Sequence, residues 1–202
     1  MKVALIGATG MAGSQILNEL LARGHHVTAI VRSPERLSPH ENVTAVQADI
    51  NNTQALIPVL QHQQAAISAV HFTEMHIEHL LDALKQAQVP RYLMVGGAGG
   101  LKVAGQRLVD SEKFPAAVKP EALAGIAILE RLQQRSDLAW TVLAPSMLFR
   151  SGERTGKFRL GKDDLLFNDQ GESAISTQDY AIALVDELEH PQHIQQRFTV
   201  GY

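Results

Sequence analysis

The chain has no cysteine among its 202 residues, which excludes disulfides, thiolate metal sites and a cysteine nucleophile. It has no run of lysines or arginines, and its net charge of −3 gives no basic surface for nucleic acid. No apolar stretch approaches the roughly 20 residues that span a bilayer. The first predicted strand begins at Lys2, which leaves no room for a signal peptide. These absences predict a cytoplasmic protein that binds neither nucleic acid nor membrane.

A glycine-rich turn near the N-terminus is the most informative feature that is present. The apolar run Lys2–Ile6 stops at Gly7-Ala8-Thr9-Gly10-Met11-Ala12-Gly13, and an amphipathic stretch follows over 14–23. Such a turn lets the backbone approach a phosphate closely and points the N–H groups of a helix at it. A tight turn with no ligand is the alternative interpretation. The pattern predicts a nucleotide site that includes Gly7, Thr9, Gly10, Met11 and Ala12.

Strands and helices alternate along the rest of the chain, whose residues are 45% hydrophobic and 19% charged. This alternation predicts one α/β domain over 1–202, a doubly wound parallel sheet of order 3-2-1-4-5-6 with helices on both faces. A short extra strand is expected at the C-terminus, and 146–202 is expected to form the lid of a substrate pocket. The predicted strands are 2–6, 26–31, 43–47, 65–70, 91–95, 140–143 and 197–200, and the predicted helices are 14–23, 53–61, 73–88, 121–134 and 177–188.

The residue that ends the second strand indicates which nucleotide binds. An NAD site normally has an acid there, whereas this chain has Arg32, whose guanidinium suits the 2′-phosphate of NADP(H). A merely solvated Arg32 is the alternative. Asp49 is predicted to meet the adenine, although a turn aspartate would look the same. The remaining predicted cofactor-binding residues, at or just beyond the ends of strands, are Ile50, Ala69, Val70, Gly96, Gly97 and Pro145.

Several of these segments together resemble a known family. The segments 7–13, 31–34, 95–99 and 152–161, together with Asp49, are similar to the atypical branch of the short-chain dehydrogenase/reductase superfamily. Within it, the chain resembles the NADH-flavin reductases and NAD(P)H-binding proteins related to biliverdin reductase B, which are NmrA-like. The resemblance covers nearly the whole chain and implies a Rossmann fold with an NADP site, while activity in this branch is diverse.

The chain lacks the superfamily's usual catalytic tyrosine with a lysine four residues later. Gly96 follows Tyr92 at that spacing, Leu184 follows Tyr180, and Tyr202 is the last residue. This departure excludes alcohol–ketone chemistry by that triad and disfavours a sugar-nucleotide epimerase. Two functions from different classes remain open. One is an NADP(H)-dependent reductase of flavins or quinones, and the other is a redox sensor that binds NADP(H) without turnover.

Reduction of a flavin or quinone depends mainly on stacking two flat rings in a dry pocket. Such a pocket needs small residues under the nicotinamide and apolar walls above it. The predicted substrate-pocket residues are Ala98, Met147, Phe149, Arg154 and Phe158. Met147 and Phe149 could equally be ordinary core residues, and Arg154 could hold an anionic substrate group or pair with a surface acid.

Two polar residues are the candidates for catalysis. His71 follows the fourth strand and could donate a proton or bind an anionic substrate group, although a solvated loop histidine is an alternative. Lys119 could reach the nicotinamide ribose, as the lysine of the resembled superfamily does, but it has no tyrosine companion. No metal site is predicted, because His76 and His79 fit the exposed side of an amphipathic helix. The sequence does not predict an oligomeric state.

Overall fold

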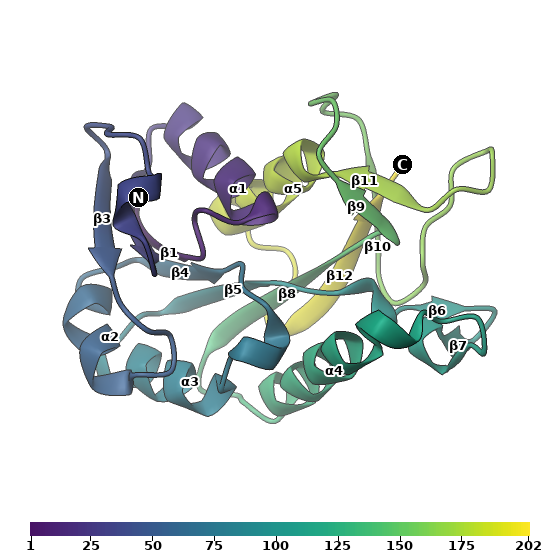
Figure 1. Ribbon diagram of the computed structural model, residues 1–202, viewed down its shortest axis with the longest axis horizontal. Coiled ribbons are helices and arrows are strands. Elements are labelled where there is room, and N and C mark those ends of the chain that lie inside the picture. The colour runs from purple at the N-terminus through teal and green to yellow at the C-terminus, as the bar shows by residue number, and fades with distance from the viewer.

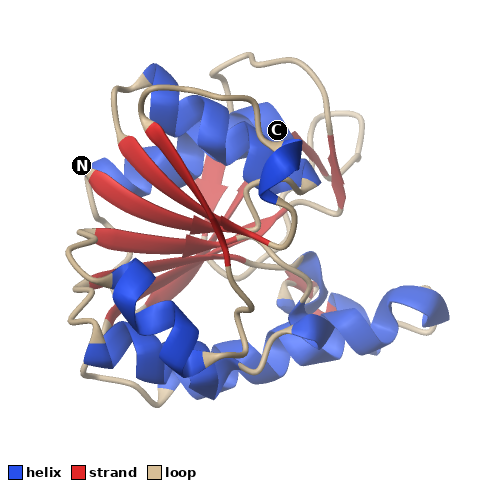
Figure 2. Cartoon of the chain, turned by 60° about the vertical axis from the view of Figure 1, so that its left-hand side comes forward, coloured by secondary structure: helices blue, strands red, loops and turns tan.

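The computed structural model describes residues 1–202 as an eight-stranded sheet between two layers of helices (Figures 1 and 2). The strand order is β10-β12-β8-β5-β4-β1-β2-β3. Neighbouring strands are parallel except for β10, which runs antiparallel to β12 at one edge. The strands are β1 (Lys2–Ile6), β2 (His26–Val31), β3 (Val43–Gln47), β4 (Ala65–Ser68), β5 (Arg91–Val95), β8 (Ala139–Pro145), β10 (Arg159–Gly161) and β12 (Gln196–Gly201).

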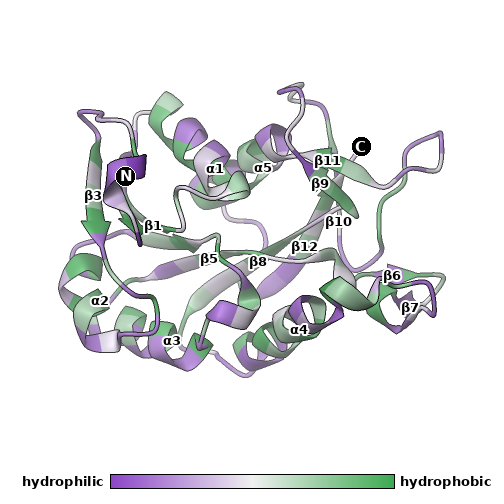
Figure 3. Cartoon of the chain, in the orientation of Figure 1, coloured by the Kyte–Doolittle hydropathy of each residue, from purple (hydrophilic) through white to green (hydrophobic).

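Five α-helices cover the two faces of the sheet. α1 (Met11–Ala22) and α5 (Thr177–Glu189) pack side by side on one face, while α2 (Thr53–Leu60), α3 (Ile77–Gln86) and α4 (Lys119–Gln133) cover the other (Figure 1). Each of these helices carries both polar and apolar residues (Figure 3). This pattern is expected of helices that bury one side against a sheet. None of the helices combines the length and apolarity needed to cross a membrane.

The central strands contribute to both hydrophobic cores because successive side chains point to opposite faces. In β1, Val3 and Leu5 join the core beneath α1 and α5, whereas Ala4 and Ile6 join the core beneath α2, α3 and α4. All four residues are at most 3% exposed. Burial on both faces explains why this strand is a continuous apolar run in the sequence.

The predicted fold class and strand order are confirmed, and the sheet is larger than predicted. β12 is the expected C-terminal strand, and β10 was not anticipated. Several boundaries were wrong: α1 begins at Met11 rather than at residue 14, and β4 ends at Ser68 rather than at residue 70. α4 begins at Lys119 instead of residue 121. α3 begins at Ile77 rather than at residue 73, because Phe72–Glu74 forms a separate 3-10 turn.

Two small sheets also escaped prediction. β6 (Lys102–Val103) and β7 (Gln106–Arg107) form a short exposed hairpin, and β9 (Leu148–Arg150) pairs in parallel with β11 (Ala174–Ser176). The β9–β11 pair follows β8 and brings the segment after the sixth predicted strand next to the start of α5. The polar region 150–171 is largely exposed and contains β10.

Candidate functional site

The loops that follow the parallel strands meet at one edge of the sheet. The strand order reverses between β1 and β4, since the chain builds outward from β1 in one direction and then returns to add β4 on its other side. Ligands of open α/β sheets bind at such a reversal, outside the carboxyl ends of the strands. The arrowheads of the strands in Figure 2 point toward this edge. Most of the predicted cofactor-binding residues lie in the loops at this edge, while Met11 and Ala12 begin α1 and Pro145 ends β8.

Two glycines of the 7–13 turn allow unusually close packing. Gly7 has a φ of +86°, and a Cβ there would lie 2.4 Å from the carbonyl oxygen of Ala69. A Cβ on Gly13 would lie 2.0 Å from the carbonyl oxygen of Gly7. Any side chain at either position would overlap the backbone. These glycines therefore hold α1 tightly against the ends of β1 and β4.

The start of α1 presents N–H groups that have no protein partner. Gly10 caps the helix without a side chain, and the first turn has no acidic residue. The backbone N–H groups of Met11, Ala12 and Gly13 donate no backbone hydrogen bond, while Ser14 begins the helical ladder by donating to Gly10. Free N–H groups at a helix N-terminus, together with the helix dipole, suit an anion. The geometry fits the pyrophosphate of a dinucleotide, with Thr9 and Gly10 on the same turn.

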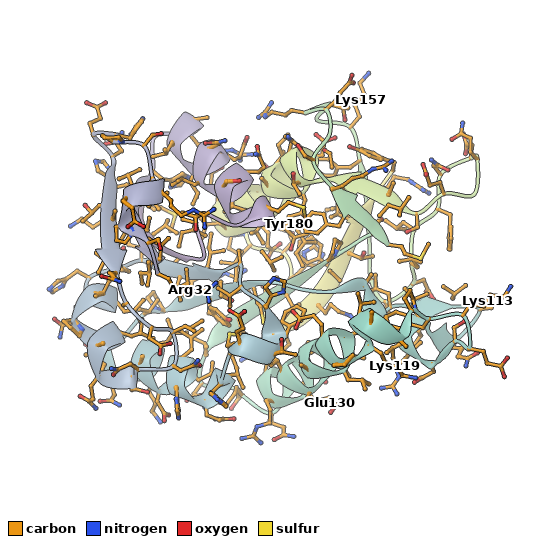
Figure 4. All side chains as sticks on the ribbon, in the orientation of Figure 1. Arg32, Lys113, Lys119, Glu130, Lys157 and Tyr180 are labelled. Atoms are coloured by element: carbon orange, nitrogen blue, oxygen red, sulfur yellow. The ribbon has the colours of Figure 1, made fainter.

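Arg32 directly follows β2, its side chain is 84% exposed, and it has one ionic partner in the protein. Its Nη1 lies 3.2 Å from Oε2 of Glu74, which belongs to the Phe72–Glu74 turn. Figure 4 shows Arg32 beside this part of the molecule. Glu74 was not among the predicted site residues. A guanidinium this exposed remains able to bind a ligand phosphate.

Asp49 and Ile50 lie after β3. One carboxylate oxygen of Asp49 accepts the N–H of Asn51 at 2.9 Å, so the residue stabilises its own turn, as the alternative interpretation held. Its side chain is nevertheless exposed, and its second oxygen has no partner in the protein. Ile50 packs at the edge of the hydrophobic core.

The segment after β4 is held from both sides. The N–H of Ala69 donates to the carbonyl of Ile6 at 2.9 Å, and Val70 packs against the core beneath α3. His71 is exposed, and its Nδ1 lies 3.2 Å from Oε1 of Glu121. This histidine is therefore anchored to the first turn of α4, the turn that also contains Lys119.

Glu121 is a site residue that the sequence did not reveal. Its carboxylate accepts the backbone N–H groups of Phe72 and Thr73 at 2.7 and 3.0 Å, and the hydroxyl of Thr73 at 2.8 Å. Burial acts against the charged form, but these hydrogen bonds, the Thr73 hydroxyl foremost, and the one from His71 lower the pKa of Glu121. The charged carboxylate thus fixes the Phe72–Glu74 turn.

The Phe72–Glu74 turn, fixed by Glu121, positions the ring of Phe72. This ring lies 3.2 Å from where a Cβ on Gly97 would be and 2.8 Å from where one on Gly125 would be. Phe72 is 9% exposed and forms part of the core. The aromatic ring therefore supports the glycine run after β5 from below.

Gly96 and Gly97 lie where the β5 loop crosses the end of β8. The N–H of Gly96 donates to the carbonyl of Leu143 at 2.8 Å, and a Cβ on Gly96 would lie 2.9 Å from the same oxygen. The hydroxyl of Tyr180 also donates to this carbonyl, at 2.6 Å. Burial raises the pKa of Tyr180 well above its usual value. Tyr180 is therefore a buried support of the site, not a proton donor.

A small cavity of about 20 Å³ lies beneath this glycine run. Arg197 contributes to its wall and donates to the carbonyl of Gly100 at 3.0 Å. The guanidinium also pairs with Asp163, and its Nε has no partner in the protein. A cavity of this size holds about one water molecule.

The predicted substrate-pocket residues differ in exposure: one is exposed, and others pack into the core. Pro145 is buried at the end of β8, and Met147 is 50% exposed beside it, its N–H donating to Ser173. Phe149 packs with its ring centroid 4.7 Å from that of Tyr180, and Phe158 packs against the same core. Ala98 begins a short turn that packs against α4. Met147 is thus an exposed residue, whereas the two phenylalanines extend the core.

Arg154 forms an ion pair with Glu19 of α1. Its guanidinium donates to both carboxylate oxygens of Glu19 at 3.0–3.1 Å. Glu19 is buried, and its carboxylate also accepts a hydrogen bond from Arg23 at 2.9 Å. Pairing with an acid was one of the two interpretations of Arg154. The geometry ties residues 151–158, here called the strap, to α1.

Lys119 is exposed at the first turn of α4 and forms no ion pair (Figure 4). His76 and His79 lie near each other, with ring centroids 5.6 Å apart, and both are bonded to Asn51. The structure contains no group of three or more acidic or histidine side chains arranged to hold a metal.

Comparisons with known proteins show the family of this chain. A family model described as NAD(P)H-binding matches residues 7–191. The uncharacterized protein YwnB of Bacillus subtilis (strain 168) is 41% identical over 209 aligned positions, covering 99% of this chain and 98% of YwnB. The structure of a "putative epimerase" from Bacteroides thetaiotaomicron is 42% identical with a TM-score of 0.95, covering 100% of this chain and 96% of that one.

A third relative has a named redox activity. The structure of a "putative NADH-flavin reductase" from Streptococcus pneumoniae TIGR4 is 36% identical with a TM-score of 0.87, covering 100% of this chain and 99% of that one. The family match extends from the glycine turn through α5, so it includes every loop of the carboxyl edge. The chain belongs to the NAD(P)H-binding family, within the atypical short-chain dehydrogenase/reductase proteins.

Proposed function

We propose that the chain is an NADP(H)-dependent reductase that passes a hydride to a small conjugated acceptor such as a flavin or quinone. The observation that carries this proposal is the pairing of unbonded N–H groups at the start of α1 with an exposed arginine at the end of β2. The first feature suits a pyrophosphate, and the second suits a 2′-phosphate. The NADH-flavin reductase name of the Streptococcus relative supports a flavin-like acceptor.

The residues proposed to hold the cofactor lie along the carboxyl edge of the sheet. The turn at Gly7, Thr9, Gly10, Met11 and Ala12 would bind the pyrophosphate, and Arg32 the 2′-phosphate. Asp49 and Ile50 would border the adenine. Ala69 and Val70 would follow the ribose and pyrophosphate, and Gly96, Gly97 and Pro145 would border the nicotinamide.

The nicotinamide supplies the hydride when it is bound, and the chain supplies alignment. Gly96, Gly97 and Ala98 leave room for a flat ring, and the buried Phe72 supports them from beneath. Residues 146–202 would form the lid, with Met147 the most exposed wall residue and Phe149 and Phe158 behind it. Stacking two rings here excludes water and orients them, which such a transfer mainly requires.

No tyrosine of the chain is placed to donate a proton in the usual way. Tyr92 and Tyr180 are buried, hydrogen-bonded to Ser68 and to the carbonyl of Leu143, and Tyr202 donates its hydroxyl to Asp179. His71 is the proposed proton donor or anion-binding group, and Lys119 the proposed partner of the nicotinamide ribose. Both lie at the first turn of α4 or are bonded to it. Arg154 would reach a substrate only by leaving Glu19. The epimerase name of the Bacteroides relative is not carried over, because the tyrosine–lysine pair is absent.

The decisive experiment is a turnover assay with a panel of flavins and quinones, following the loss of NADPH absorbance. Steady oxidation that depends on the added acceptor is the expected result. Tight NADPH binding with no turnover across the panel would refute the reductase proposal and favour a redox sensor. Oxygen reoxidises reduced flavin and so recycles the acceptor, and each assay is therefore repeated under anaerobic conditions.

A further inference from the structure

Glu74 lies at the position where a ligand phosphate would meet Arg32. The two side chains form an ion pair at 3.2 Å, and they are 52% and 84% exposed respectively. Arg32 has no other acidic partner, and the carboxylate of Glu74 has no other cationic partner. The pair therefore couples the end of β2 to the Phe72–Glu74 turn beside the proposed adenosine site.

The backbone of Glu74 is fixed on both sides. Its carbonyl accepts the side-chain amide of Asn51 at 2.9 Å, and the carbonyl of that amide accepts the N–H of His76 at 2.8 Å. On the other side, Glu121 accepts the N–H groups of Phe72 and Thr73. The carboxylate of Glu74 can thus leave Arg32 by rotating its side chain, but its backbone stays beside the guanidinium.

A 2′-phosphate and Glu74 would require the same donors. The guanidinium binds an anion best through two parallel N–H groups, and Nη1 of Arg32 already forms an ion pair with Glu74. The unphosphorylated ribose of NADH makes no such demand. We propose that Glu74 is a specificity-determining residue that competes with the 2′-phosphate for Arg32 and so moderates the preference for NADPH over NADH. This inference depends on the proposed NADP(H) site.

The size of the effect follows from the exposure of the pair. Exposed ion pairs contribute little because water and salt screen them. Releasing Arg32 from Glu74 should therefore tighten NADPH binding about two- to fivefold, and less at high salt. NADH binding should change less than about 1.5-fold.

The test compares Glu74→Gln with a matched control, Glu78→Gln. Both variants remove one negative charge from an exposed glutamate, but Glu78 pairs with Arg131 at 2.7 Å, away from Arg32. Dissociation constants for NADPH and NADH are measured by calorimetry at low and high salt. The expected result is tighter NADPH binding in Glu74→Gln only. Unchanged or weaker NADPH binding in that variant would overturn the inference.

A double variant separates competition from direct repulsion. In an Arg32→Ala background, Glu74→Gln should no longer alter NADPH affinity, because there is no guanidinium to release. An unchanged gain in that background would show that Glu74 repels the phosphate directly and would refute competition. If the unmodified protein bound neither dinucleotide, the proposed function itself would fail. If it bound both and Glu74→Gln had no effect, only this inference would fail.

Discussion

The glycine turn at 7–13 and the strap at 151–158 have equally distinctive sequences, yet their polar groups behave in opposite ways. In the glycine turn, N–H groups at the start of α1 have no protein partner. In the strap, the polar groups that face the protein are bonded to it. Asp179 alone accepts the Thr155 hydroxyl at 2.5 Å and the Gly156 N–H at 2.8 Å.

This contrast shows how to separate a binding loop from a structural one. Buried or packed polar groups need hydrogen-bond partners, and the strap finds them within the chain. Asp179 is fully buried and also accepts the hydroxyl of Tyr202, while Ser176 donates to the carbonyl of Glu153. The glycine turn leaves its donors available to a ligand. The family-like sequence therefore serves folding in the strap, whereas in the turn it leaves donors free for the proposed cofactor.

Gly13→Ala should give the largest effect on the glycine turn. The added Cβ would overlap the carbonyl of Gly7, so we expect a loss of about 3 kcal/mol or more in the free energy of unfolding. Urea unfolding followed by circular dichroism measures it. Gly10→Ala is the matched variant, because its Cβ would lie 3.4 Å from the nearest backbone atom. It should keep the fold and weaken dinucleotide binding, and equal destabilisation by both variants would contradict the packing argument.

Asp179→Ala should cause the next largest loss of stability, through its effect on the strap. It removes a buried acceptor of three hydrogen bonds, so we expect a loss of about 3 kcal/mol in the free energy of unfolding. Limited proteolysis should show early cleavage within 151–158. NADPH affinity should change much less than stability, because the strap contributes no proposed cofactor contact.

Arg154→Met is the control within the strap. The Arg154 side chain is 58% exposed, so its loss should cost less than about 1 kcal/mol. If Arg154 binds an anionic substrate group, this variant would instead raise KM for the acceptor while leaving stability nearly unchanged. An unchanged KM would assign Arg154 to the strap alone.

Glu121→Gln should have a pH-dependent effect on the carboxyl edge that is smaller than the effect of Asp179→Ala. The folded-state pKa of Glu121 lies below its ordinary value of 4.5, so its charged form stabilises the fold above that pH. We expect the variant to be about 1 kcal/mol less stable near neutral pH. This difference should shrink as the pH falls below 4.5 and through the lowered pKa. A difference that stayed constant with pH would contradict the role of the charged carboxylate.

The sequence predicted the β1–α1–β2 unit, which contains much of the proposed site, because local patterns determine it. The glycine spacing and the apolar run before it do not depend on distant residues, and Arg32 ends a strand that is evident from its β-branched residues. Glu121 was missed because it acts on a turn far away in the sequence. For the same reason the helix predicted from residue 73 begins at Ile77, since Glu121 holds Phe72 and Thr73 in another conformation. Similarly, nothing in the strap sequence indicates that Arg154 binds Glu19.

The short strands β6, β7, β9 and β11 could not be predicted either. Each has only two or three residues, too few for a period-2 pattern to stand out. The pairing of β9 with β11 also depends on where β8 ends and α5 begins, which only the folded sheet defines.

The most direct test of the account is calorimetric titration of NADPH and NADH into the protein and into Arg32→Ala. The account predicts that both dinucleotides bind the unmodified protein. The substitution should weaken NADPH about tenfold or more while changing NADH less than about twofold. Absence of binding by either dinucleotide, or equal losses for both in Arg32→Ala, would contradict it.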